Sequence, residues 1–150
     1  MIKIRQAINT DLPAILQMQE TWLKENITYG YIEPKEKILL KYNKEYFYVA
    51  EKDEKIIAYI ACEVIENNKS VINIAGKYLE ISDVYVTKSE RKEGIGKMLI
   101  DKVEELAKTN GLTQIQLCSS VKDIKKIIKF YESCGFNSFF IRMFKDLNNQ

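Results

Sequence analysis

The segment Arg91-Lys92-Glu93-Gly94-Ile95-Gly96 has the residue types of a phosphate-binding turn. It follows an apolar stretch that ends in Val84-Tyr85-Val86 and precedes apolar residues at helical spacing, which indicates a strand, a polar turn and a helix start. The first N–H groups of a helix have no partner within the helix, and the helix dipole is positive at that end. Because Gly94 and Gly96 have no Cβ atom, an anion could approach the backbone there.

Two familiar phosphate motifs do not fit this turn. A Walker loop requires Ser or Thr after its Gly-Lys pair, whereas Met98 follows Gly96-Lys97. A dinucleotide-binding fingerprint requires a third glycine where this chain has Leu99. The two glycines alone are also compatible with a turn that uses them only for its geometry. Four basic residues, which would favour a polyanionic ligand, surround the turn: Lys88, Arg91, Lys92 and Lys97.

The absence of histidine limits the catalytic chemistry that the chain can perform. Without histidine, no Ser–His or Cys–His pair can supply a nucleophile. The three cysteines, Cys62, Cys118 and Cys134, are widely spaced and include no CxxC pair. A zinc site would need carboxylates or all three thiolates, so no metal is expected. Proton transfer must therefore use Glu, Asp, Tyr, Lys, Cys or water.

Hydrophobic periodicity predicts strands and helices in the order β-α-α-β-β-β-α-β-α-β. Strands are expected at residues 2–6, 46–51, 55–66, 79–87, 113–118 and 136–144. Helices are expected from residues 9–11 through Trp22, from Glu33-Pro34, from Gly94 to Asn110 and over residues 124–134. In the last helix, the stripe that should face the core consists of Ile124, Ile127, Ile128 and Tyr131. The order predicts one α/β domain over residues 1–150, a mixed sheet with helices on both faces.

The composition is that of a soluble globular domain, with 46% apolar and 29% charged residues. A net charge of +2 argues against a dedicated nucleic-acid binder. No apolar stretch is long enough to cross a bilayer, so no membrane partner is expected. The N-terminal residues alternate like a strand and contain no signal-peptide core, which predicts a cytoplasmic location. The sequence leaves open whether the chain is a monomer or a homodimer.

In its context, the turn resembles the coenzyme A signature of the GNAT N-acetyltransferase superfamily. That signature is an apolar strand followed by Arg or Gln, two residues, Gly, one residue, and Gly or Ala, as in residues 84–96 here. A second segment, Phe130-Tyr131-Glu132-Ser133-Cys134-Gly135-Phe136, resembles the FYxxxGF helix end of the family. Two motifs in the right order are more specific than either alone. The predicted element order also matches the family fold, whose sheet is mixed and mostly antiparallel.

The resemblance implies that acetyl-coenzyme A is the cosubstrate and that no metal takes part. Val84, Tyr85 and Val86 would run beside the pantetheine arm. Lys88 and Ile124 depart from the family pattern, which commonly has proline and asparagine there, and the second departure removes one expected polar contact. The pyrophosphate would bind to the backbone N–H groups of Arg91, Lys92, Glu93, Gly94, Ile95, Gly96 and Lys97.

Transfer of an acetyl group to an amine requires a base for the ammonium group and benefits from an acid for the leaving thiolate. By resemblance, Tyr131 is the acid and Glu80, six residues before Val86, is the base. Strand alternation would place Glu80 on the face of Val86 and Asp83 on the opposite face. Asp83 is therefore the rival base, and only one of the two carboxylates could face the thioester. The alternatives are a solvated or ion-paired Glu80 and a Tyr131 that only packs in the core.

In this family the acceptor enters opposite the cofactor, between the first two helices and the last strands. Tyr29 and Tyr31 lie in the loop after the first helix and are candidates for contact with an amine through their aromatic faces. Packing against the core is the alternative for both rings. The implied activity is direct acetyl transfer to a primary amine of a small molecule or peptide. A non-catalytic module of the same fold that binds acyl-coenzyme A is the competing hypothesis.

Overall fold

The computed structural model describes residues 1–31, 39–66, 76–139, 141–143, 145 and 147. Its described residues form one five-stranded sheet, ordered β1-β2-β3-β4-β5. All neighbouring strands are antiparallel except β4 and β5, which are parallel. The mixed, mostly antiparallel sheet predicted from the sequence is therefore confirmed. The strands are β1 (Ile2–Gln6), β2 (Phe47–Lys52), β3 (Lys55–Glu66), β4 (Lys77–Val86) and β5 (Ile115–Leu117).

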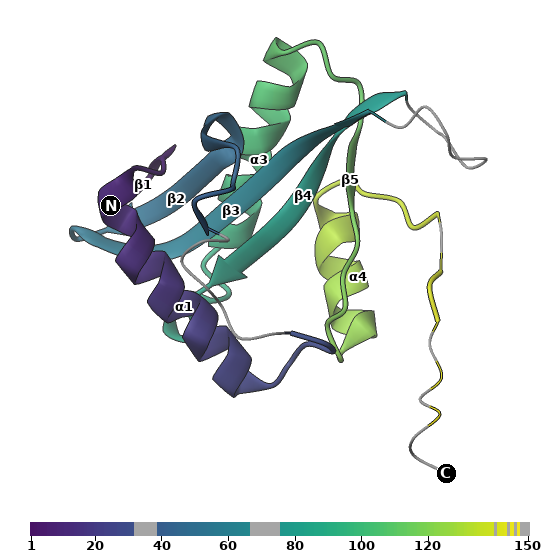
Figure 1. Cartoon of the computed structure of the whole chain (residues 1–150), viewed down its shortest axis with the longest axis horizontal. Coiled ribbons are helices and arrows are strands. Elements are labelled where there is room, and N and C mark those ends of the chain that lie inside the picture. The colour runs from purple at the N-terminus through teal and green to yellow at the C-terminus, as the bar shows by residue number, and fades with distance from the viewer. Residues whose placement is uncertain (32–38, 67–75, 140, 144, 146, 148–150) are drawn as a thin grey trace.

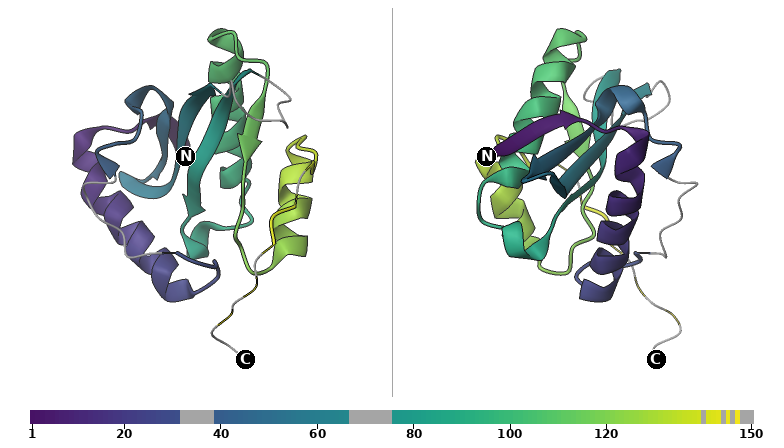
Figure 2. Two further views of the ribbon diagram at one scale, coloured as in Figure 1. Left: turned by 45° about the vertical axis from the view of Figure 1, so that its right-hand side comes forward. Right: turned by 90° about the vertical axis from the view of Figure 1, so that its left-hand side faces the viewer.

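Helices cover both faces of this sheet (Figure 1). Helix α1 (Leu12–Glu25) lies on one face, and α3 (Ile95–Thr109) and α4 (Ile124–Ser133) lie on the other, as the two turned views in Figure 2 also show. Three short 3-10 helices join these elements: η1 (Asn9–Asp11), η2 (Lys44–Tyr46) and η3 (Lys88–Glu90). The helix predicted from Glu33-Pro34 lies outside the described residues.

Each face of the sheet has its own apolar cluster. Leu99, Ile100 and Val103 of α3 are almost completely buried against the strands, and they belong to the larger cluster. Ile15 and Met18 of α1 are buried in the second cluster, which lies on the opposite face. The spacing of these residues is that of an amphipathic helix with one face on a sheet. Both helices are therefore held by burial of one apolar face.

A β-bulge interrupts β4 in its middle. Ala61 of β3 pairs with Asp83, and the next residue, Cys62, pairs with Ile81. Ser82 is therefore an extra residue in β4 that has no counterpart in β3.

The extra residue changes which side chains share a face. Leu79 and Ile81, before the bulge, pack in the same cluster as Val84 after it. Glu80 therefore faces the α1 side of the sheet, and so does Asp83, whose carboxylate contacts Gln19 of α1. The prediction that Glu80 and Asp83 lie on opposite faces is wrong, because strict alternation holds only in a strand without a bulge.

The bulge also marks the point where β4 and β5 separate. Residues Leu79–Ile81 pair with β5, which ends at Leu117. The N–H of Thr87 donates to the carbonyl of Ile57 on β3, 2.9 Å away. Because residues of an antiparallel strand bond to one neighbour alternately, Val84 and Val86 direct their N–H and C=O groups away from β3. Beyond the bulge, β4 thus presents an edge that β5 does not cover.

Two predictions for the C-terminal third differ from the structure. Ile124 and Ile128 of the predicted stripe are 49% and 36% exposed, whereas Tyr131 packs against the core as predicted, together with Phe130 and with Cys134 just after the helix. The described residues between 136 and 144 form no strand, and Phe139 is half exposed. A strand requires a hydrogen-bonded neighbour, and no described strand pairs with this segment.

A partly buried ion pair fixes the entry into α1. Both carboxylate oxygens of Asp11 accept hydrogen bonds from Arg5, at 2.7 and 2.8 Å, and Arg5 also donates to Glu51 of β2. The Asp11 carboxylate also accepts the N–H of Ile8, which would otherwise be unpaired. The bonds from Arg5 lower the pKa of Asp11, although its burial opposes ionisation.

We expect Asp11→Asn to lower the free energy of unfolding by about 2 kcal/mol at pH 7, because charged hydrogen bonds are lost. The folded-state pKa of Asp11 is depressed, so its contribution is present above the unfolded pKa of about 4 and is lost as the pH falls through the folded value. Urea unfolding at pH 7 and at pH 3 should therefore show a difference between wild type and variant that shrinks in acid. The control Asp101→Asn removes an exposed pair with Lys97 and should leave the free energy of unfolding almost unchanged. A difference for Asp11→Asn that is the same at both pH values would contradict this account.

Candidate functional site

The predicted turn lies between the end of β4 and the start of α3. Lys92 and Gly94 have φ values of 72° and 77°, in the left-handed region. A lysine in this region costs about 1 kcal/mol, and such strain concentrates at functional sites. Gly94 is the residue immediately before α3, and its conformation explains why glycine is needed there.

The backbone N–H groups of the turn are unusually free. The first hydrogen bond of α3 runs from the N–H of Met98 to the carbonyl of Gly94, at 3.0 Å. Within the described part of the chain, the N–H groups of residues 92 to 97 donate no hydrogen bond. With the positive end of the α3 dipole, these groups can bind an anion of several oxygens.

The two glycines of the turn have different roles. A Cβ atom on Gly94 would meet no atom within 4 Å, so its space is open. A Cβ atom on Gly96 would lie 3.0 Å from Cζ of Phe130 in α4. Gly96 therefore allows α4 to approach the start of α3, a reason that the sequence prediction did not include. The two family motifs, Arg91 to Gly96 and Phe130 to Phe136, meet at this contact.

The side chain of Arg91 points away from the free N–H groups. Its Nε donates to the carbonyl of Val86 at 2.9 Å, and its two terminal nitrogens donate to the two oxygens of Glu25, both at 2.8 Å. The guanidinium carbon lies 5.3 Å from the centre of the Tyr85 ring. Lys92 is exposed at the turn, whereas the amine of Lys97 is bonded to Asp101.

The open edge of β4 lies next to this turn. Val84 and Val86 are half-buried, and both direct their backbone groups toward the side that β5 leaves uncovered. An extended ligand with amide groups could pair there as an added strand. Tyr85 is arranged differently, because its backbone faces β3 and its buried side chain faces α1.

Tyr131 lies on α4 and packs against the cluster on the α3 side of the sheet. The rings of Phe130 and Phe136 contact it edge-on, with ring centres 5.1 and 5.6 Å away. Burial, together with the nearby Cys134 and Asp83, raises the pKa of Tyr131 to about 12. Its phenol is therefore protonated at neutral pH. No described residue is hydrogen-bonded to its hydroxyl group.

The two candidate bases have different surroundings. Glu80 is partly exposed, and burial together with the nearby Glu80 carboxylate raises the pKa of Tyr78. Asp83 is only 9% exposed. Its Oδ2 accepts hydrogen bonds from Tyr59 at 2.7 Å, Tyr42 at 3.0 Å and Gln19 at 3.1 Å. Burial raises the pKa of Asp83, and these bonds only partly oppose that effect.

The two loop tyrosines point to different neighbours. Tyr31 stacks on Trp22, which in turn stacks on Tyr85, with ring centres 4.6 and 5.3 Å apart. Tyr29 is half exposed, and the amine of Lys122 lies 5.6 Å from its ring centre. Tyr31 therefore belongs to the aromatic layer next to Asp83, whereas Tyr29 lies beside the segment that precedes α4.

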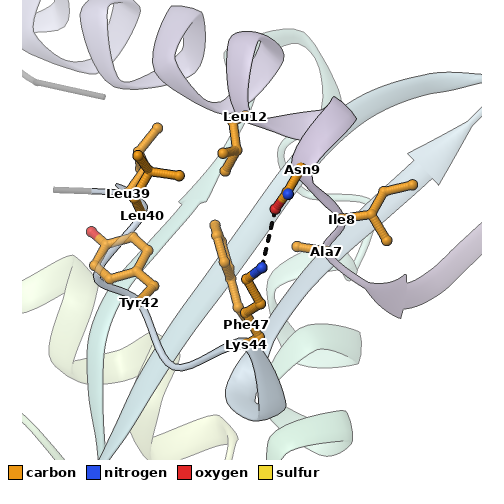
Figure 3. A pocket seen from close by; sticks show the side chains of 9 residues that line it. All are labelled: Ala7, Ile8, Asn9, Leu12, Leu39, Leu40, Tyr42, Lys44 and Phe47. Carbon is orange, nitrogen blue, oxygen red and sulfur yellow. Dashed lines mark hydrogen bonds between the residues drawn. The ribbon is translucent and has the colours of Figure 1, made fainter. Parts of the chain in front are cut away.

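A small hollow is located at the other end of α1, far from the turn. Figure 3 shows its lining side chains and the hydrogen bond of 3.2 Å from Lys44 to Asn9. Its volume of about 10 Å³ has room for roughly one water molecule. The hollow is therefore too small to bind a cosubstrate. It is lined by Ala7, Ile8, Asn9, Leu12, Leu39, Leu40, Tyr42, Lys44 and Phe47.

Four polar residues near the site were not identified from the sequence: Gln19, Glu25, Tyr42 and Tyr59. One signal for Glu25 was present, because a carboxylate in the last turn of a helix is unfavourable next to the negative end of the dipole unless it has a partner. The described residues contain no group of three or more potential metal ligands. They also contain no helix long and apolar enough to cross a membrane.

Comparison with known proteins agrees with the motifs. The family model described as the acetyltransferase (GNAT) family matches residues 6–136. An uncharacterised N-acetyltransferase from Methanocaldococcus jannaschii is 33% identical over 101 residues, which are 67% of this chain and 42% of that relative. The chain thus matches less than half of the length of this curated relative.

Two solved structures illustrate the likeness in fold. An aminoglycoside acetyltransferase from an uncultured soil metagenomic sample, in complex with trehalose, has a TM-score of 0.71 at 22% identity, covering 97% of this chain and 96% of its own. A predicted acetyltransferase from Clostridium acetobutylicum, solved with acetyl-CoA, has a TM-score of 0.68 at 22% identity, covering 100% and 99%.

The contact between Gly96 and Phe130 can be tested by a double-mutant cycle. Gly96→Ala should lower the free energy of unfolding by about 1 kcal/mol, because its Cβ crowds the ring. In the Phe130→Leu background, the same change should raise stability by about 0.5 kcal/mol, because alanine favours the helix. Urea unfolding of the four proteins measures both changes. If Gly96→Ala had the same effect in both backgrounds, the two residues would not be coupled.

Proposed function

The chain belongs to the acetyltransferase (GNAT) family, and from this premise we propose that it transfers an acetyl group from acetyl-coenzyme A directly to a primary amine of a small molecule or peptide. The observation that carries the proposal is the pair of incompletely hydrogen-bonded backbone surfaces at the end of β4. One is the set of free N–H groups of residues 92–97, and the other is the edge at Val84 and Val86. The two surfaces are adjacent and match a ligand that joins a pyrophosphate to an amide-containing arm.

In the proposed complex, the pyrophosphate accepts hydrogen bonds from the N–H groups of residues 92–97 at the positive end of α3, whereas the N–H of Arg91 already donates to the carbonyl of Lys88. The pantetheine arm extends along β4, and its amides pair with the backbone of Val84 and Val86. The carbonyl of Val86 already accepts from Arg91, but a carbonyl oxygen has two lone pairs and can accept a second bond. The likeness to a fold neighbour solved with acetyl-CoA supports this assignment.

We assign Tyr131 the role of the acid that protonates the leaving thiolate. Its raised pKa keeps the phenol protonated over the whole physiological pH range. Its position on α4 supports the role, because Gly96 allows α4 to pack against the turn that would hold the cofactor. A phenol with no described hydrogen-bond partner is also available to a ligand.

For the base we favour Glu80, acting through water, over Asp83. Glu80 is partly exposed, so water can reach its carboxylate. The Oδ2 of Asp83 already accepts three hydrogen bonds from neutral groups, and this saturation opposes the role of a freely accessible base. Both carboxylates face α1, so this face would receive the amine. The aromatic layer of Trp22 and Tyr31 lies on the same face and would suit a cationic acceptor.

The function is tested by thiol release from acetyl-coenzyme A across a panel of primary amines that includes an aminoglycoside, a polyamine and a peptide. We expect turnover with at least one amine, and Tyr131→Phe should lower kcat by at least about tenfold with little change in coenzyme A affinity. An intact affinity shows that the variant is folded. Tight binding of acetyl-coenzyme A without turnover on any amine would instead indicate a non-catalytic module.

The two candidate bases are separated by comparing Glu80→Gln with Asp83→Asn. With Glu80 as the base, Glu80→Gln should lower kcat/KM for the amine by about 100-fold at pH 7. The difference in kcat/KM between wild type and Glu80→Gln should become smaller as the pH approaches the pKa of the amine, because a neutral amine needs no base. Asp83→Asn should reduce the rate by a factor that does not depend on pH. The opposite pattern in the two pH profiles would make Asp83 the base.

A further inference from the structure

Glu25 lies where it can stabilise the turn between β4 and α3 without touching a ligand. It is the last residue of α1, and its side chain is 12% exposed. Its two oxygens accept the paired hydrogen bonds from Arg91 and one from the hydroxyl of Tyr85. Partial burial opposes ionisation of Glu25, but the bonds from Arg91 and Tyr85 outweigh this effect and hold its pKa below the ordinary value.

This arrangement uses the whole guanidinium group of Arg91. Nε bonds to Val86, both terminal nitrogens bond to Glu25, and the Tyr85 ring lies beside the group. The planar guanidinium thus joins three elements, namely α1, the end of β4 and the turn that follows. Arg91 therefore stabilises the conformation of the turn, and its charge is already neutralised by Glu25.

The end of α1 is also connected to residues 26–31, which we call the acceptor loop because the proposed function places the amine near it. Asn26 ends the helix in the left-handed conformation, with φ of 51°. Its side chain accepts a hydrogen bond of 2.8 Å from the amine of Lys122, and the carbonyl of Ile27 accepts the N–H of Lys122 at 2.9 Å. Thr28 and Val121 form an isolated bridge. The segment that follows Glu25 is thus bonded to the residues that precede α4, the helix that carries Tyr131.

Trp22 strengthens the same connection from one turn earlier in α1. Its indole N–H donates to the hydroxyl of Thr28 at 2.9 Å, and its ring lies between Tyr31 and Tyr85. A shift of the end of α1 would therefore move the acceptor loop and disturb the partners of Arg91 together. With the Glu25–Arg91 pair, contacts run without a break from the turn before α3, through the end of α1 and the acceptor loop, to the start of α4.

We propose that Glu25 is a positioning residue that holds the pyrophosphate turn in its binding conformation through Arg91 and connects it to the acceptor loop, residues 26–31. The proposal rests on the proposed function. It assigns Arg91 a role in shaping the backbone, whereas a direct role of its side chain would be attraction of the phosphates.

The two roles predict opposite effects when Glu25 is neutralised. If the charge of Arg91 attracted the phosphates, Glu25→Gln would release a guanidinium next to a polyanion and strengthen binding of coenzyme A. If Arg91 braces the turn, the same variant loosens the N–H groups and weakens binding. The sign of the change therefore decides between them.

The experiment measures the affinity of coenzyme A and of acetyl-coenzyme A by isothermal titration calorimetry, without an acceptor. For Glu25→Gln we expect Kd to rise about tenfold, the factor that corresponds to loss of one charged hydrogen bond. Tyr85→Phe keeps the ring but removes its bond to Glu25, and should raise Kd about threefold. In turnover, Glu25→Gln should raise KM for acetyl-coenzyme A while kcat at saturation stays within about threefold, a split that general loss of structure would not give.

Two further variants test whether Glu25 acts through Arg91. In the Arg91→Gln background, adding Glu25→Gln should have almost no further effect on Kd, because the partner is already absent. Glu105→Gln is the matched control, since it removes an exposed carboxylate that pairs with Lys102 on α3, outside the turn. It should leave Kd unchanged within about twofold, and the thermal midpoints show whether each variant is folded. If Glu25→Gln does not fold, the Kd of Tyr85→Phe, which we expect to rise, decides whether Glu25 has the positioning role.

An unchanged or lower Kd for folded Glu25→Gln, or for Tyr85→Phe in its place, would overturn the positioning role and leave the proposed function intact. Additive effects of Glu25→Gln and Arg91→Gln would also overturn it, since Glu25 would then act independently. A wild-type chain that bound no coenzyme A would instead overturn the proposed function, and the positioning role with it.

Discussion

The backbone groups of β4 beyond Ser82 must find hydrogen-bond partners, and β5 does not supply them. In most sheets an interior strand is paired along both edges. Here the bulge and the early end of β5 at Leu117 leave the groups of Val84 and Val86 facing an uncovered edge. The turn that follows adds a second set of unpaired N–H groups before α3 becomes regular. These two adjacent surfaces give the fold a place where an extended, anionic ligand can complete the sheet.

The other features of the site stabilise the conformation of these two backbone surfaces. Gly96 lets α4, which carries Tyr131, come close to the turn on one side of the sheet. Arg91 and Glu25 hold the turn from the opposite side, through α1. Glu25 and Asp83 illustrate two ways of burying a carboxylate. Glu25 has a cationic partner and stays ionised, whereas Asp83 has only neutral donors, and its pKa rises.

The sequence predicted the turn well because its residues carry strong local signals. Glycine at a strand-to-helix turn indicates a left-handed conformation, and Gly94 has one. The face of Glu80 was predicted incorrectly, because a bulge at Ser82 is set by how β3 and β4 pair and has no local signature in the sequence. The role of Gly96 also depends on a distant residue, Phe130, which only the packing of α3 and α4 brings close. Long-range contacts of this kind also explain why Glu25 was missed: its partner Arg91 is 66 positions away.

The central claim is that acetyl-coenzyme A binds to the backbone at the end of β4 and the start of α3. The most direct measurement is the change of backbone amide chemical shifts in the isotope-labelled chain as coenzyme A is added. The account predicts the largest changes at the N–H groups of residues 92–97 and at Val84 and Val86. Unchanged amides in these residues, with shifts gathered elsewhere in the chain, would contradict it.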